Sequence, residues 1–129
     1  MSDIEILKSI SVVYAEDDEL IRQSITRIIR RRVKEIYSAE HGKEGLDLIQ
    51  QFNPDMVITD IEMPVMNGLE MIEEVRKIYG PDTPVIVVTA YQDDEHHTDL
   101  ADAYIYKPIE SQELFELMIR LTKERKKLL

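Results

Sequence analysis

The chain has 129 residues, of which 43% are hydrophobic and 33% are charged, and its formal net charge is −10. This length suits one compact domain, and the composition excludes a disordered or membrane-spanning chain. The lack of cysteine excludes disulfides and thiolate chemistry, and it fits a reducing cytoplasm. The negative charge argues against direct nucleic-acid binding by this domain, and no apolar run approaches the roughly 20 residues of a membrane helix, so we expect no membrane contact.

The first half of the chain alternates apolar runs with helical patterns. Residues 10–15 are apolar and rich in β-branched side chains, which predicts a strand. Residues 19–32 carry apolar side chains at helical spacing and predict a helix. The same alternation then predicts a short strand over 33–38, a helix over 42–52 and a buried strand over 55–59.

The second half continues the alternation, with one weak segment. Helical spacing predicts a helix over 69–79, and the run PVIVVT predicts a strand over 84–89. Residues 92–101 (QDDEHHTDLA) lack a clear apolar stripe, so their helix is expected to be shortened or irregular. A short strand over 103–106 and a final helix over 111–127 complete the pattern.

The order of these elements predicts the architecture. Strands that are apolar throughout are covered on both faces, as in a parallel sheet between two layers of helices. Right-handed crossovers between such strands give a doubly wound α/β fold with a five-stranded parallel sheet.

In such a sheet, functional groups gather at the carboxyl ends of the strands. The first strand leads into Glu16 and Asp17, and the third leads into Asp60. The fourth strand ends at Thr89, and the fifth runs into Lys107. Neighbouring carboxylates repel one another unless a cation neutralises them, and Mg²⁺ prefers such oxygen ligands. With a lysine and a hydroxyl nearby, the set favours phosphoryl transfer to a carboxylate.

Four segments carry a resemblance to a known family: VVYAEDDELIR, PDMVITDIEMPVMNGLEMI, PVIVVTA and AYIYKPI, in this order. From about Ser9 to about Leu121, the chain resembles a receiver domain of the bacterial two-component response regulators and is chemotaxis-regulator-like. The resemblance implies a flavodoxin-like strand order of 2-1-3-4-5. It also implies a single receiver domain over 1–129, in which residues 122–129 end the last helix or begin a linker.

The resemblance assigns the acidic residues to phosphorylation and metal binding. It implies that Asp60 is the phosphoacceptor and, with Asp17, a direct ligand of Mg²⁺, for which Mn²⁺ could substitute. Glu16 would reach the metal through water, and Glu62 would offer its backbone carbonyl.

Further positions match the family's switch. Thr89 would be the hydroxyl that moves toward the phosphoryl group, and Lys107 would pair with the phosphoryl oxygens. Tyr104 occupies the position of the aromatic switch residue, and the Lys107-Pro108 bond is expected to be cis.

The resemblance also implies a function and its partners. The chain would accept a phosphoryl group from a histidine kinase or a histidine phosphotransfer protein and change its output face. It would not be an enzyme beyond Mg²⁺-dependent self-phosphorylation and autodephosphorylation. An output domain or partner protein fits the pattern, as does a homodimer through the fourth helix, fifth strand and fifth helix, although the weak 92–101 segment puts this face in question.

Two other functions remain open. An aspartyl phosphatase or phosphotransferase would use a similar intermediate, but its nucleophile usually follows the first strand in a D-x-D arrangement. Here that strand ends in Glu16-Asp17-Asp18, with Asp18 expected at the helix start. A docking module without phosphorylation is the third hypothesis, although every key residue of the site is retained.

Two residues near these motifs bear on how long the phosphoryl group lasts. Tyr91 lies two residues after Thr89 and Glu62 two residues after Asp60, at positions that influence phosphoryl lifetime in the family. Together they suggest hindered attack by water and slow self-dephosphorylation. The three histidines are expected at the surface and away from the acidic edge: His41, His96 and His97.

Overall fold

The computed structural model describes residues 1–128, the side chains of 126–128 excepted. Its sheet has five parallel strands: β1 (Ser11–Ala15), β2 (Glu35–Ala39), β3 (Met56–Thr59), β4 (Val85–Thr89) and β5 (Ala103–Tyr106). They lie in the order β2-β1-β3-β4-β5, which confirms the expected flavodoxin-like arrangement. Ala15 pairs with Thr59 and Thr89 with Tyr106, so the residues after these strands emerge at one edge.

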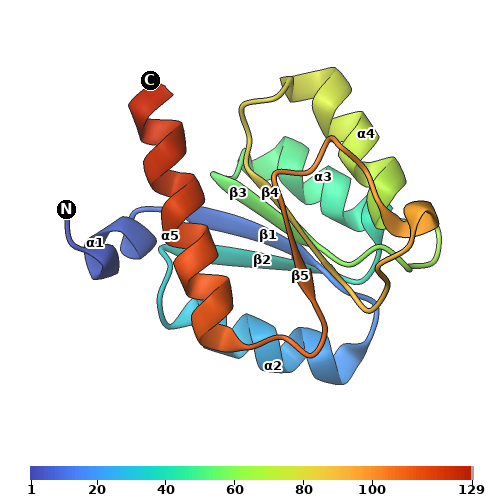
Figure 1. The fold of residues 1–129 in the computed structure, drawn as a ribbon, viewed down its shortest axis with the longest axis horizontal. Helices are drawn as coiled ribbons and strands as arrows, with labels where there is room; N and C mark the ends of the chain where they lie inside the picture. Colours follow the sequence, from blue (N-terminus) through green and yellow to red (C-terminus); the bar gives the residue numbers. More distant parts are fainter. Residues whose placement is uncertain (129) are drawn as a thin grey trace.

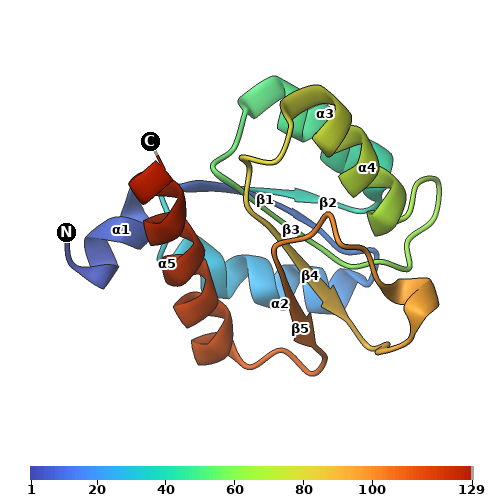
Figure 2. The same ribbon diagram turned by 45° about the horizontal axis from the view of Figure 1, so that its top comes forward.

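Helices cover both faces of the sheet, as predicted. They are α1 (Asp3–Lys8), α2 (Glu19–Arg30), α3 (Gly42–Phe52), α4 (Gly68–Tyr79) and α5 (Ser111–Leu128). Figures 1 and 2 show α3 and α4 side by side on one face, with α2 and α5 on the other and α1 beside α5. Among the described helices, none combines the length and apolar content needed to cross a membrane.

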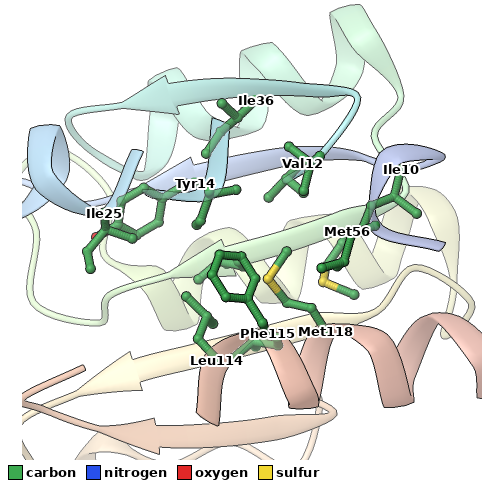
Figure 3. Close-up of a cluster of buried hydrophobic side chains, with 14 of the residues drawn as sticks. Ile10, Val12, Tyr14, Ile25, Ile36, Met56, Leu114, Phe115 and Met118 are labelled. Carbon is green, nitrogen blue, oxygen red and sulfur yellow. The ribbon is translucent and has the colours of Figure 1, made fainter. Parts of the chain in front are cut away.

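Each strand contributes side chains to two separate hydrophobic cores, because successive side chains point to opposite faces of the sheet. On β1, Val12 and Tyr14 enter the core shared with α2 and α5, whereas Val13 and Ala15 enter the core shared with α3 and α4. Figure 3 shows Tyr14 and Val12 facing Phe115 of α5 across the first core. Full burial of such side chains contributes about 1.5–3 kcal/mol each, so both faces hold the sheet in place.

The sequence did not predict α1. Ser2 caps it, because the Ser2 hydroxyl accepts from the Glu5 amide and the Glu5 carboxylate accepts from the Ser2 amide. Burial of Ile6 and Leu7 holds the helix, and an exposed ion pair between Asp3 and Lys123 at 3.3 Å adds a contact with α5. A six-residue helix is too short for a periodic pattern to reveal it.

Some boundaries and faces also differ from expectation. The second strand begins at Glu35 rather than residue 33, because residues 31–34 form the turn after α2. Helical spacing places Leu20 and Ile78 on inner faces, but they are 79% and 47% exposed. Leu20 lies in the first turn of α2 and Ile78 in the last turn of α4.

The segment between β4 and β5 contains no α-helix, which confirms the prediction of a shortened or irregular element. Its regular structure is a single 3-10 turn, η1 (Asp94–His96). The end of this segment next to β5 is held by the Arg76 guanidinium of α4, which donates to the Leu100 carbonyl at 2.9 Å and to the Asp102 carboxylate at 3.0 Å. Asp102 in turn accepts from the Val85 amide at 2.7 Å.

We expect Arg76→Ala to lower the free energy of unfolding by about 2–3 kcal/mol, because the Leu100 and Thr83 carbonyls lose their charged donor and Asp102 keeps only the Val85 amide. The Arg76 side chain is 11% exposed, so water can replace few of these bonds. Urea denaturation measures the change. Lys77→Ala is the matched control: its side chain is 69% exposed, and the expected change is within about 0.5 kcal/mol. Equal effects of the two substitutions would contradict the role assigned to Arg76.

Candidate functional site

Three carboxylates from two neighbouring strands meet at the carboxyl edge of the sheet. Glu16 and Asp17 follow β1, and Asp60 follows β3. Each offers an oxygen, and these oxygens all lie within 4.8 Å of one another. Glu16 is 1% exposed and Asp60 is 7% exposed, while Asp17 is open to solvent. Buried like charges this close require a cation.

Lys107 supplies one cation from the end of β5. Its ammonium donates to Glu16 Oε1 at 2.9 Å and to Asp60 Oδ2 at 2.8 Å. Burial raises the pKa of the Glu16 carboxyl to about 7, although the Lys107 hydrogen bond acts in the opposite direction. Burial alone would lower the pKa of Lys107, but its bonds to Asp60 and Glu16 outweigh this and raise that pKa. The Lys107-Pro108 peptide bond is cis, as expected.

The backbone holds Asp60 in place from several sides. Its amide donates to the Ala15 carbonyl at 3.0 Å, and its Oδ1 accepts from the Ile61 amide at 2.7 Å. Gly68, the first residue of α4, packs directly against the Asp60 backbone. A Cβ added at Gly68 would lie 2.0 Å from the Asp60 carbonyl oxygen, so only glycine fits there.

The two expected switch residues lie on neighbouring strands. Thr89 is fully buried at the end of β4, where its hydroxyl accepts from the Tyr91 amide at 3.0 Å. Tyr104 on β5 is half-buried, and its hydroxyl donates to the Thr98 carbonyl and accepts from the Thr98 amide, both at 2.6 Å. The tyrosine therefore ties the segment after η1 to the sheet.

The comparisons with known proteins agree with this geometry. The family model described as the response regulator receiver domain matches residues 12–119. The chain belongs to this family. Receiver domains of this family act in two-component signalling, where a phosphorylation switch is the general function.

Among curated proteins, the receiver domain is 34% identical over 122 residues to the transcriptional regulatory protein HptR of Staphylococcus aureus. This alignment covers 87% of the chain and 46% of HptR, so the chain spans less than half of that relative's length. The likeness therefore concerns only part of HptR.

Solved structures show the same fold over nearly the whole chain. A CheY-like receiver domain protein from Methanospirillum hungatei superposes with a TM-score of 0.86 at 28% identity, covering 94% of this chain and 99% of that one. The response regulator TrrA of Thermotoga maritima, solved in complex with Mg²⁺-BeF, gives a TM-score of 0.76 at 34% identity, covering 86% and 97%.

One histidine of the receiver domain contacts an acidic side chain of the loop after β3, which the sequence did not predict. His96 Nε2 is 2.5 Å from Glu62 Oε1, and its Nδ1 is 2.6 Å from Asp93 Oδ1. The Asp93 and Glu62 carboxylates raise the pKa of His96. The contact joins residues 34 positions apart through an irregular loop, so no periodic pattern could reveal it.

Sequence reasoning also missed the role of Arg22. Its guanidinium donates to the Glu16 carbonyl at 2.9 Å and so braces the loop between β1 and α2. The expectation for Asp18 is confirmed, because its side chain caps α2 by accepting from the Ile21 amide at 3.0 Å. The sequence does contain a signal for this contact, because Arg22 lies one turn after the capping residue Asp18, within reach of the loop before the helix.

Proposed function

We propose that the chain is a phosphorylation-dependent signalling switch in which Asp60 accepts a phosphoryl group from a histidine kinase or a histidine phosphotransfer protein. The observation that carries the proposal is the convergence of Glu16, Asp17 and Asp60 on one point, with Lys107 donating to two of them. Such a cluster provides a nucleophile, a cation site and a fixed positive charge at the same edge.

The donor set fits Mg²⁺, and Mn²⁺ could replace it. Asp17 and Asp60 would bind the ion directly, Glu16 would act through water, and Glu62 would contribute its backbone carbonyl. The three carboxylates offer hard oxygen ligands within 4.8 Å of one another, and Asp17 is open to solvent, which suits an ion that keeps several waters. When bound, the ion would neutralise charge on the carboxylates and the phosphoryl oxygens.

The protein's own groups prepare Asp60 for attack. The Ile61 amide and the Lys107 ammonium each bind one carboxylate oxygen, which fixes the orientation of the side chain. An Asp60 oxygen forms the new bond to phosphorus as the bond from phosphorus to the donor's nitrogen or oxygen breaks, and that atom keeps the electron pair. Lys107 then pairs with a phosphoryl oxygen.

The response would begin at Thr89 and Tyr104. A phosphoryl group adds strong acceptors at the edge, so the Thr89 hydroxyl gains a partner that the unphosphorylated state lacks. Tyr104 would report this change on the face formed by residues 90–102, β5 and α5. That face would contact an output domain, a partner protein or a second copy of the chain.

The remaining expectations stand as parts of this proposal. They are a single receiver domain over 1–129, a cytoplasmic location, and no enzymatic activity beyond self-phosphorylation and autodephosphorylation. α5 continues to Leu128, so residues 122–128 extend the last helix, and residue 129 lies outside the described residues.

We expect Mg²⁺ affinity to fall about tenfold between about pH 8 and about pH 6, because a proton on Glu16 competes with the ion. Burial raises the pKa of Glu16 to about 7, so its negative charge is present above this pH and is lost below it. Isothermal titration of the purified chain with Mg²⁺ measures the effect. Glu16→Gln should bind more weakly at every pH and show a flatter profile. A wild-type affinity that does not change with pH would contradict the proposed part of Glu16 in metal binding.

A further inference from the structure

The His96 ring joins three residues that the sequence keeps far apart. It contacts the Glu62 carboxylate on one side, the Asp93 carboxylate on another, and stacks on the Tyr91 ring with centroids 4.0 Å apart and planes inclined by 16°. We call these four residues the His96 clasp. Figures 1 and 2 both show η1, drawn in orange, beside the loop that follows β3.

His96 is the most buried member of the pairs that it forms with Glu62 and Asp93. The His96 side chain is 12% exposed, whereas the side chains of Glu62 and Asp93 are 65% and 53% exposed. Both ring nitrogens and a ring face are in contact with other side chains, so rotation of His96 would break every contact at once. A side chain this buried, with contacts on three sides in a loop without an α-helix, can position that loop.

Both ends of the His96 clasp connect to the phosphorylation site. Glu62 lies two residues after Asp60, in the loop that leaves β3. Tyr91 lies two residues after Thr89, and its amide donates to the Thr89 hydroxyl at 3.0 Å. The clasp therefore bridges the carboxyl ends of β3 and β4, where Asp60 and Thr89 lie.

We propose that His96 is a positioning residue that fastens the loop between β4 and β5 across the mouth of the acidic site and slows the attack of water on phosphorylated Asp60. In that hydrolysis, the water oxygen bonds to phosphorus and the bond from phosphorus to the Asp60 oxygen breaks, with the electron pair returning to the carboxylate. Hydrogen phosphate leaves with one proton of the water, and the other proton passes to solvent. The kinetic part rests on the proposed function, whereas the clasp itself belongs to the unphosphorylated protein.

The clasp is tested first without phosphorylation. Backbone amide relaxation by NMR should show increased mobility over residues 91–97 in both His96→Ala and Glu62→Ala. The Glu62 variant is informative because it lies outside the loop, and its backbone carbonyl is retained. His97→Ala is the matched control: His97 stacks on Tyr104 and pairs with Asp99, so its loss leaves the contact with Glu62 intact. Unchanged order over 91–97 in both test variants would overturn the proposal.

The kinetic part is tested by following the decay of the aspartyl phosphate after the phosphodonor is removed. We expect His96→Ala and Glu62→Ala each to speed decay about threefold to tenfold. The double variant should decay no faster than His96→Ala, because that substitution already removes the contact with Glu62. His96→Gln, whose side-chain amide can still donate to Glu62, should recover part of the slow decay, and His97→Ala should decay like the wild type.

These outcomes separate the two proposals. Unchanged decay in the phosphorylated His96 and Glu62 variants, or fully additive effects in the double variant, would overturn the inference. A wild-type chain that takes up no phosphoryl group would instead contradict the proposed function, and the amide mobility of the two variants would still decide whether the clasp orders the loop.

Discussion

Lys107→Met should lower the free energy of unfolding by about 2–4 kcal/mol at about pH 8 without divalent cations, and Mg²⁺ should restore most of that loss. The substitution keeps the apolar stem of the side chain but removes the ammonium that donates to both Glu16 and Asp60. Two buried carboxylates then repel each other without a fixed cation. Chemical denaturation with and without Mg²⁺ measures the difference.

A surface lysine provides the control for this result. Lys43 pairs with Asp47 on the exposed face of α3, and its side chain is 53% exposed. Lys43→Met should change stability by less than about 0.5 kcal/mol and show no added response to Mg²⁺. If Lys107→Met lost the same stability in the presence and absence of Mg²⁺, then Lys107 and the metal would not neutralise the same carboxylates, Glu16 and Asp60.

Gly68→Ala should destabilise the protein by about 3 kcal/mol or more, because the added Cβ would meet the Asp60 carbonyl oxygen at 2.0 Å. The obstacle is backbone on both sides, so relief requires α4 or the Asp60 loop to move. Either shift disturbs the Asp60 carboxylate and should also weaken Mg²⁺ binding. Thermal or urea denaturation, together with Mg²⁺ titration, measures both effects.

Gly45→Ala is the matched control for Gly68→Ala. Gly45 also lies in a helix, but the nearest atom to its added Cβ is Met71 Sδ at 2.8 Å, the end of a flexible side chain. The gain in helix propensity offsets part of this cost, so we expect less than half the destabilisation of Gly68→Ala. If the two substitutions lowered the free energy of unfolding equally, the clash with the Asp60 backbone would not be the cause of the effect at Gly68.

The sheet and its acidic edge could be predicted because the signals are local and repeated. Continuous apolar runs mark strands covered on both faces, and parallel strands bring their carboxyl ends to one edge. Asp60 and Lys107 follow such runs directly, so their closeness follows from topology. The missing stripe in 92–101 likewise predicted an irregular segment, which the single 3-10 turn η1 confirms.

The unpredicted features depend on contacts between distant or irregular segments. His96 reaches Glu62 only because a loop without an α-helix folds back over the edge of the sheet. The closeness of Gly68 to the Asp60 carbonyl is a packing distance that residue spacing does not encode. The helix α1 is held by a capping box and two buried side chains, which are too few residues to give a period.

The most direct test of the account is Mg²⁺-dependent phosphorylation of the purified chain by acetyl phosphate, read by intact mass, with Asp60→Asn measured alongside. We predict one added phosphoryl group in the wild type, none when Mg²⁺ is chelated, and none in the variant. A wild-type chain that binds Mg²⁺ but takes up no phosphoryl group from acetyl phosphate or a histidine kinase, or a variant that is phosphorylated as fully as the wild type, would contradict the assignment of Asp60 as the acceptor.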